Sequence, residues 1–186
     1  MNENFTIRNI SNFELQKVTD WAKIEGFAPG FDDISIYKNT DKQGLWVGCL
    51  NGVPIGSIAC VKYNSSYGFI GLFIVKKEYR NRGYGVCLWK HALNYLKDIK
   101  CIGLEAAPNR IKDYEKWGFE TSSVTNRWKL HGCENIPKSY FYKDIHSEFK
   151  VVPSNQISSE AVLIYDSQRE PSPRPHFLND WLRNSF

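Results

Sequence analysis

One arginine and two glycines lie between an apolar run and a helical pattern. Arg80, Gly83 and Gly85 follow the apolar residues 69–75, and the apolar positions of residues 86–96 recur every three or four residues. This order predicts a buried strand, a turn and a helix. The first N–H groups of a helix have no intrahelical partner, and glycines let an anion approach the backbone. The stretch therefore predicts a site for a phosphate or a similar anion.

The spacing excludes two common phosphate loops. No Gly-Lys-Ser/Thr follows, as a Walker A loop requires, and no third glycine lies three residues after Gly85, as a Rossmann fingerprint requires. Instead, the pattern Arg-x-x-Gly-x-Gly at Arg80, Gly83 and Gly85 resembles the acetyl-CoA signature of the GNAT-type N-acetyltransferases. The alternative is a tight strand-to-helix turn with solvated arginines.

A second motif follows one expected strand later. Residues 114–119 read Tyr-Glu-Lys-Trp-Gly-Phe, which is similar to the Tyr-Glu-Lys-x-Gly-Phe helix of GNAT-type chains. The resemblance implies that Tyr114 is the general acid that protonates the departing thiolate of CoA. The alternative is a tyrosine whose ring lies in the core and whose hydroxyl is hydrated.

The resemblance implies acetyl-CoA as co-substrate and indicates the residues that hold it. In the family, the strand before the loop pairs with the pantetheine arm, and the N–H groups of the loop bind the pyrophosphate. An asparagine at the place of Asn109 often contacts CoA, although Asn109 could equally be a helix N-cap. The implied cofactor-binding residues are Phe73, Ile74, Val75, Arg80, Asn81, Arg82, Gly83, Tyr84, Gly85 and Asn109.

Acetyl transfer to an amine also needs a group that removes a proton from the amine and a donor for the oxyanion. For the base we consider Glu105, Asp33 and Glu25, in that order. Glu105 belongs to the strand that would border the cofactor cleft, although strand alternation could equally direct it to solvent. The oxyanion donor is expected to be a backbone N–H near Val75.

The turn-rich residues 26–33 are the expected wall of the amine site. This stretch carries Phe27, Phe31 and Asp33, which we assign to substrate binding. The alternative is that both phenylalanines fill the core while Asp32 and Asp33 cap the next helix. Acidic groups there would suit a cationic acceptor, either a small-molecule amine or a lysine side chain.

Alternation and turn residues predict the elements around these sites. Asn51-Gly52 is a strong hairpin signal, and a crossover helix between two strands implies that they run parallel. We expect strands at 5–8, 45–50, 53–63, 69–75, 101–106 and 121–130, and helices after Ser11 and at 34–38, 86–96, 109–117 and 177–182. The fold class is α/β (α+β). The resemblance implies the GNAT fold, with a mixed sheet of six or seven strands, a splayed parallel pair and about four helices.

The chain is expected to comprise a GNAT domain at residues 1–132 and a proline-rich C-terminal extension at 133–186. The residues from 173 to 182 resemble the connector of a GNAT subgroup that carries a second C-terminal lobe, most of which would be absent here. The alternative is a tail that packs Trp181 onto the domain or onto a second copy, as in a homodimer.

Composition excludes several other classes. The 186 residues carry a formal net charge of only +4, which is too weak to indicate nucleic-acid binding. We expect no membrane span, signal peptide or metal, because no long apolar run or ligand spacing is present. The cysteines lack Cys-x-x-Cys spacing, which favours reduced, buried thiols in a cytoplasmic protein.

These features together predict an N-acetyltransferase that moves acetyl directly from acetyl-CoA to a primary amine in a ternary complex. The alternative from another class is a non-catalytic module that binds or senses acetyl-CoA. A weaker third reading is an acyltransferase that uses a longer acyl-CoA, against which the bulk of Phe73 argues.

Overall fold

The computed structural model describes residues 3–30, 32–126, 128–135, 137, 150 and 152–184. The chain forms two compact units. The first comprises residues 1–105 together with 159–186, and the second comprises residues 106–158. Each unit is described by itself.

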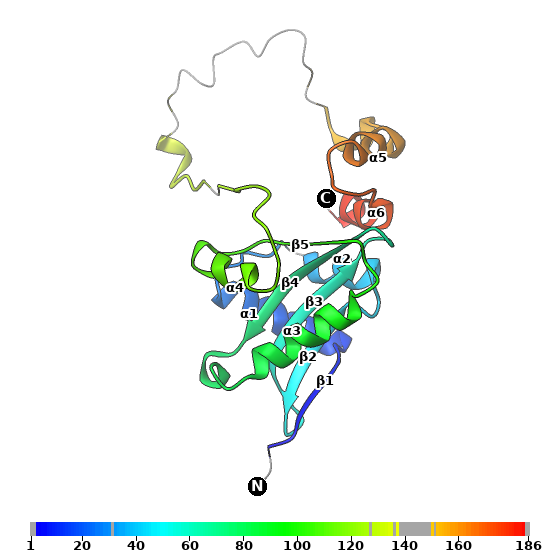
Figure 1. The fold of residues 1–186 in the computed structure, drawn as a ribbon. Helices are drawn as coiled ribbons and strands as arrows, with labels where there is room; N and C mark the ends of the chain where they lie inside the picture. The colour runs from blue at the N-terminus through cyan, green and yellow to red at the C-terminus, as the bar shows by residue number, and fades with distance from the viewer. Residues whose placement is uncertain are drawn as a thin grey trace. The chain divides into compact units, whose positions relative to one another are not determined.

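The first unit is built on a five-stranded sheet in the order β1-β2-β3-β4-β5 (Figure 1). Neighbouring strands run antiparallel from β1 to β4, whereas β4 and β5 run parallel, as a crossover helix requires. The strands are β1 (Phe5–Asn9), β2 (Leu45–Leu50), β3 (Val53–Lys62), β4 (Tyr67–Val75) and β5 (Cys101–Leu104).

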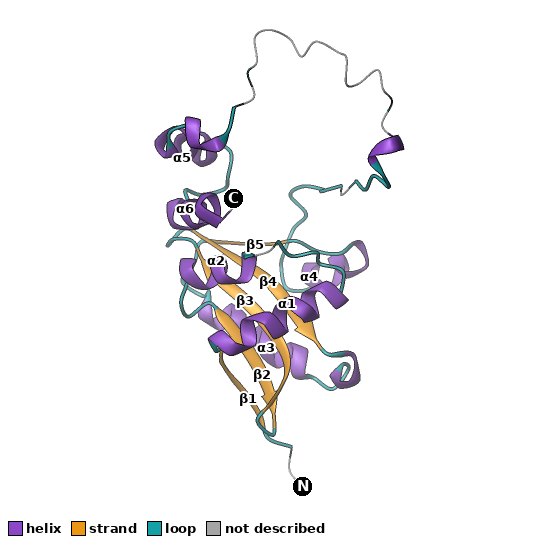
Figure 2. Cartoon of the chain, turned by 180° about the vertical axis from the view of Figure 1, so that it is seen from behind, coloured by secondary structure: helices purple, strands orange, loops and turns teal. Residues whose placement is uncertain are grey.

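Helices cover both faces of this sheet (Figures 1 and 2). On one face lie α1 (Leu15–Ile24) and α2 (Asp33–Thr40), whose buried Val18 and Ile34 join the core of β2 and β3. On the other lies α3 (Tyr84–Tyr95), which buries Leu88 and Trp89. After residue 158 the chain adds α5 (Ser159–Ser167) and α6 (Pro175–Asn184), and α6 packs beside α2.

Local signals explain where the first elements begin and turn. Ser11 and Glu14 form the expected capping box, although the first turn is the 3-10 helix η1 (Asn12–Glu14). Asn51 and Gly52 both have positive φ, 50° and 82°, as a two-residue type I′ hairpin between β2 and β3 requires.

The second unit contains η3 (Pro108–Arg110), α4 (Ile111–Glu115), η4 (Cys133–Asn135) and η6 (Ser154–Gln156). The expected strand at 121–130 is wrong: the described residues of this segment have no strand, and Val124 and Trp128 are 81% and 90% exposed. Alternation alone does not make a strand, because a strand also needs a partner edge for its hydrogen bonds.

The expected counts of strands and helices therefore need correction. Across the described residues the sheet has five strands rather than six or seven, and six α-helices are present, one more than the five expected along the chain. The additional helix α5 was not predicted, whereas α6 confirms the helix expected at 177–182. Cys87 and Cys101 are exposed, so the expectation of buried thiols holds only for Cys49 and Cys60 among the cysteines reported free. No described helix has the length and apolar character needed to cross a bilayer.

Candidate functional site

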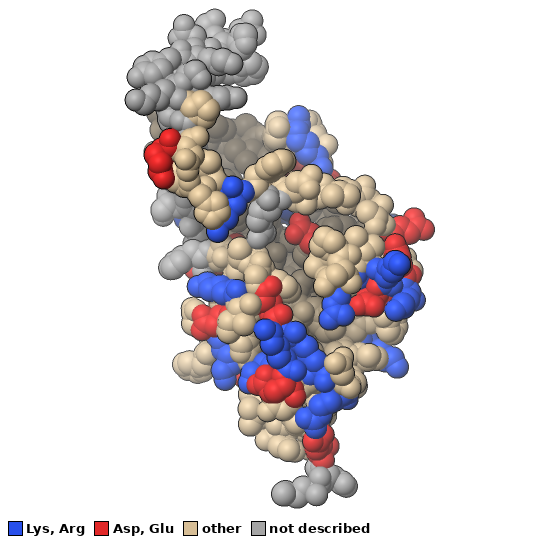
Figure 3. Space-filling view, turned by 90° about the vertical axis from the view of Figure 1, so that its left-hand side faces the viewer, with Lys and Arg blue, Asp and Glu red and all other residues tan. Residues whose placement is uncertain are grey.

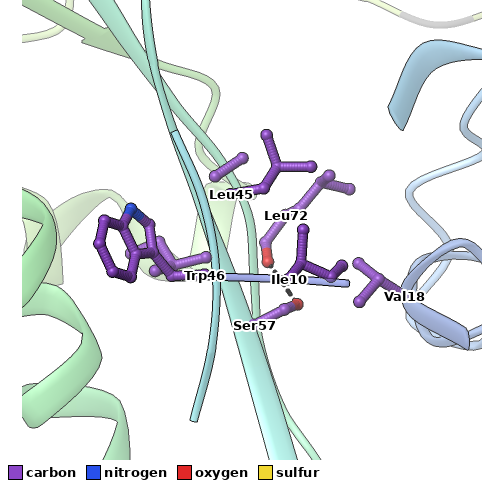
Figure 4. A pocket seen from close by; sticks show the side chains of 8 residues that line it. Ile10, Val18, Leu45, Trp46, Ser57 and Leu72 are labelled. Atoms are coloured by element: carbon purple, nitrogen blue, oxygen red, sulfur yellow. Dashed lines mark hydrogen bonds between the residues drawn. The ribbon is translucent and has the colours of Figure 1, made fainter. Parts of the chain in front are cut away.

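Strand β4 contains a bulge. Its register against β3 shifts between Ser57 and Ala59, and Leu72 adopts a left-handed φ of 47°, which is strained for a residue with a branched side chain. The buried Ser57 hydroxyl donates a 2.9 Å hydrogen bond to the Leu72 carbonyl (Figure 4). A hydroxyl from the neighbouring strand therefore holds the strained turn of the bulge.

The pocket in Figure 4 belongs to the core. Leu72 lies there with Ile10, Val18 and Leu45 on the α1 side of the sheet, while Trp46 projects from the other side (Figure 4). The side chains leave no space for even a water molecule. This cavity is therefore packing, not a ligand site.

Beyond the bulge, one edge of β4 has no neighbouring strand among the described residues. The pairing of β4 with β5 ends at Ile70↔Leu104, although β4 continues to Val75. The other edge stays paired with β3 through Ser57↔Ile74 and Gly56↔Val75. An extended ligand with amide groups can hydrogen-bond to such a free edge as an added strand does. The residues Phe73, Ile74 and Val75 lie on this segment.

The expected anion loop connects β4 to α3. After η2 (Lys77–Tyr79) the chain passes through Asn81 at φ 60° and Gly83 at φ 86°, and Gly83 is the N-cap of α3. Cys87 donates its N–H to the Gly83 carbonyl, so the earlier N–H groups of the first turn have no intrahelical acceptor. A Cβ at Gly83 would meet no atom within 4 Å, so the backbone there is open to approach.

Several of the basic side chains around this loop are paired with carboxylates. Lys76 lies 2.8 Å from Glu78, and Arg82 pairs with Glu3, which also accepts a 2.6 Å hydrogen bond from the Tyr84 hydroxyl. In Figure 3, Lys and Arg side chains gather with Asp and Glu side chains on the lower part of the face. Hydrogen bonds from Tyr84 and Arg82 lower the pKa of Glu3.

Arg80 is bonded inside the first unit. Its Nε donates to the Val75 carbonyl at 2.7 Å, and its Nη2 lies 2.6 Å from a carboxylate oxygen of Glu25. The sequence did not indicate this ion pair, because its two partners lie 55 positions apart.

Two of the base candidates act electrostatically on one tyrosine that the sequence did not single out. Burial raises the pKa of Tyr37 to about 12, and the negative charges of Asp33 and Glu105 add to the shift. Asp33 also accepts a 2.7 Å hydrogen bond from the Gly30 N–H, and Glu105 is exposed. The sequence feature that could have indicated Tyr37 is its spacing from Asp33, since residues four apart on one helix are neighbours.

The expected amine wall is described only in part. Phe27 is 43% exposed, so it does not fill the core. Asp32 is the N-cap residue of α2 but makes no capping hydrogen bond through its side chain. Phe31 lies outside the described residues.

In the second unit, Tyr114 lies in α4 with its ring 6.3 Å from that of Phe119, at 66°. Burial raises the pKa of Tyr114, which keeps its hydroxyl protonated at neutral pH. Asn109 is exposed within η3, and the N-cap of α4 is Arg110, so Asn109 is not that helix's cap.

Comparison with known families agrees with this arrangement. The model of the acetyltransferase (GNAT) family matches residues 11–119, which is more than half of the chain. The chain belongs to the GNAT acetyltransferase family. This GNAT chain is also 28% identical over 179 residues to holothin acyltransferase from a Pseudoalteromonas strain. The match covers 96% of the chain but only 58% of that relative's length.

Solved structures share the GNAT fold. One is a protein from Pyrococcus horikoshii assigned as an acetyltransferase, with a TM-score of 0.70 and 19% identity. The match covers 98% of this chain and 63% of that protein. Another is Naa50 of Arabidopsis thaliana, which was solved with a bisubstrate analogue that contains CoA and matches with a TM-score of 0.53 and 22% identity. The match covers 64% of this chain and 85% of that protein.

Proposed function

We propose that this GNAT chain transfers acetyl from acetyl-CoA to a primary amine, directly, within a ternary complex. The observation that supports this most is the continuous path from the bulge at Leu72, along the free edge of β4, to the Gly83 loop and α3. One segment of backbone thus offers hydrogen bonds for an amide-bearing arm and N–H groups for a phosphate.

In this proposal the free edge at Phe73 and Ile74 aligns the pantetheine arm, and the N–H groups from Asn81 to Val86 bind the pyrophosphate. Alignment of the thioester lowers the entropic part of the barrier. A backbone N–H near the end of β4 stabilises the oxyanion that forms on the acetyl carbonyl. Asn109 is an additional CoA contact.

The amine arrives as a cation and must lose a proton before it attacks. Glu105 and Asp33 are the proposed acceptors of that proton; the charges of both act on Tyr37. Phe27 and Phe31 supply the apolar wall, and the acidic charge favours a cationic amine, either a small molecule or a lysine side chain.

The amine nitrogen then bonds to the acetyl carbon, and the bond from that carbon to sulfur breaks. Tyr114 gives its hydroxyl proton to the departing thiolate, a role that suits a phenol kept protonated by burial. The acetylated nitrogen loses its second proton, which returns Tyr114 to its neutral form, directly or through water. The products are an N-acetylated amine and free CoA.

A non-catalytic acetyl-CoA-binding module is the second candidate. It would use the same loop but would have no need of Tyr114. The name of the relative, holothin acyltransferase, favours catalysis, and leaves the acyl group itself as a question for experiment. We also propose a cytoplasmic location and a homodimer, the latter to be checked by sedimentation.

The first experiment is thermal unfolding with and without acetyl-CoA, because a ligand specific for the native state raises the melting temperature by mass action. We expect acetyl-CoA and CoA both to raise it, after which amines are screened for release of free thiol. Binding without turnover on any amine would favour the binding module. No shift at saturating acetyl-CoA would contradict both readings.

A further inference from the structure

The first arginine of the signature is engaged inside the fold rather than directed at an incoming anion. Arg80 donates from Nε to the Val75 carbonyl at 2.7 Å and forms an ion pair with Glu25 at 2.6 Å. Both side chains are partly buried, 32% exposed for Arg80 and 22% for Glu25. The positive charge of Arg80 therefore already has a close carboxylate partner.

The two partners of Arg80 belong to different elements that matter to the proposed site. Val75 is the last residue of β4, at the end of the free edge. Glu25 is the C-cap of α1, directly before the residues 26–33 of the proposed amine wall. A planar guanidinium with several fixed donors is suited to hold two acceptors in one geometry.

We propose that Arg80 and Glu25 are positioning residues rather than a phosphate ligand and a base. If the proposed function holds, the pair fixes the end of the β4 edge at Val75 and couples it to the end of α1 at Glu25. Glu25 is then no longer a candidate for the general base, and the backbone N–H groups of the loop bind the pyrophosphate.

A ligand without phosphates separates the two roles of Arg80. S-acetylpantetheine carries the thioester and the pantetheine amides of acetyl-CoA but no pyrophosphate. If Arg80 positions the β4 edge, Arg80→Gln weakens binding of both ligands by a similar factor, roughly tenfold or more, as for a lost charge-assisted hydrogen bond. A loss confined to acetyl-CoA in titration calorimetry would overturn the inference.

Glu25→Gln gives a second test that needs acetyl-CoA alone. A phosphate-binding arginine released from its carboxylate should bind acetyl-CoA as well as before or more tightly. A positioning pair predicts weaker binding, a loss similar to that of Arg80→Gln, and little further loss in the double variant. Unchanged or tighter binding by Glu25→Gln would overturn the proposal.

The matched control is the Arg8–Glu14 ion pair, which has a similar length of 2.7 Å and begins on β1 at the opposite edge of the sheet. Arg8→Gln should leave both affinities unchanged at a temperature where every variant is fully folded by circular dichroism. Arg80→Lys should restore binding only in part, because an ammonium lacks the planar fork. If the unaltered chain fails to bind acetyl-CoA, the proposed function itself fails.

Discussion

At the scale of single residues, the environment of Tyr114 gives it the protonation state that an acid needs. A phenol is a weak acid, and partial burial raises its pKa further, so the proton is held until a strong base forms nearby. In the proposed reaction the departing thiolate accepts this proton, and the proton that the acetylated nitrogen releases restores the phenol.

Replacement of Tyr114 by Phe removes this proton but keeps the ring that lies near Phe119. We expect turnover to fall by about 10²-fold, the lower end of the effect of general acid catalysis, with little change in the affinity for acetyl-CoA. Steady-state kinetics and calorimetry measure the two quantities. An intact rate would mean that another group, or water, protonates the thiolate.

Glu14 is a carboxylate whose titration should affect stability. Its pKa in the folded chain is about 2, against an ordinary value of 4.5, chiefly because Arg8 donates hydrogen bonds to it. A depressed carboxylate pKa contributes stability above the unfolded value, and the contribution is lost as the pH falls through 4.5 toward 2.

We therefore expect Glu14→Gln to lose this contribution to stability at neutral pH. Between pH 4.5 and 2 its free energy of unfolding should depend less on pH than that of the unaltered chain. Urea unfolding at a series of pH values would measure the difference. If the free energy of unfolding of the variant and of the unaltered chain varied in parallel with pH, the depressed pKa of Glu14 would be contradicted.

At the scale of elements, the turn from β4 into α3 depends on a left-handed residue at Gly83. A Cβ in that conformation costs about 1 to 2 kcal/mol whatever the surroundings. Gly52 offers a matched control, since its φ of 82° is nearly the same and a Cβ there also meets no atom within 4 Å.

We expect Gly83→Ala and Gly52→Ala to lower the free energy of unfolding by similar amounts. Only Gly83→Ala should also weaken acetyl-CoA binding, because only that turn carries the proposed pyrophosphate contacts. Chemical denaturation and calorimetry on both variants make the comparison. If the two variants bound acetyl-CoA with equal affinity, the loop at Gly83 would not be part of the binding site.

The elements also show what could be predicted from sequence. The hairpin at Asn51 and Gly52 and the strand–loop–helix around Gly83 were predictable, because local backbone preferences fix both. The bond from Ser57 to Leu72 and the pair of Arg80 with Glu25 were not, because each depends on which distant segments the fold brings together. The expected strand at 121–130 was wrong for the same reason: alternation does not reveal whether a partner edge exists.

At the scale of the whole molecule, the chain returns to its first unit after residue 158. Leu178 of α6 is only 6% exposed, and Phe177 stacks on Tyr37 and contacts Tyr63 edge-on. Asn64 donates a 2.8 Å hydrogen bond to the Pro173 carbonyl. Helix α6 is therefore part of the packed core of this unit.

Replacement of Leu178 by Ala should lower the free energy of unfolding by roughly 2 to 5 kcal/mol, as for a buried leucine elsewhere. Leu130→Ala is the matched control, since Leu130 is 57% exposed and should change stability little. Urea unfolding of the two variants tests the difference. Equal stability would mean that α6 contributes little to the unit.

The free edge of β4 has a consequence for solubility. An apolar strand with unpaired backbone groups is a template on which strands of other chains can add. Lys77, two residues after Val75, places positive charge where such a growing stack would bring like charges together. If acetyl-CoA covers this edge, as proposed, it also shields the edge from strand addition, and the unliganded chain should be the more prone to self-association.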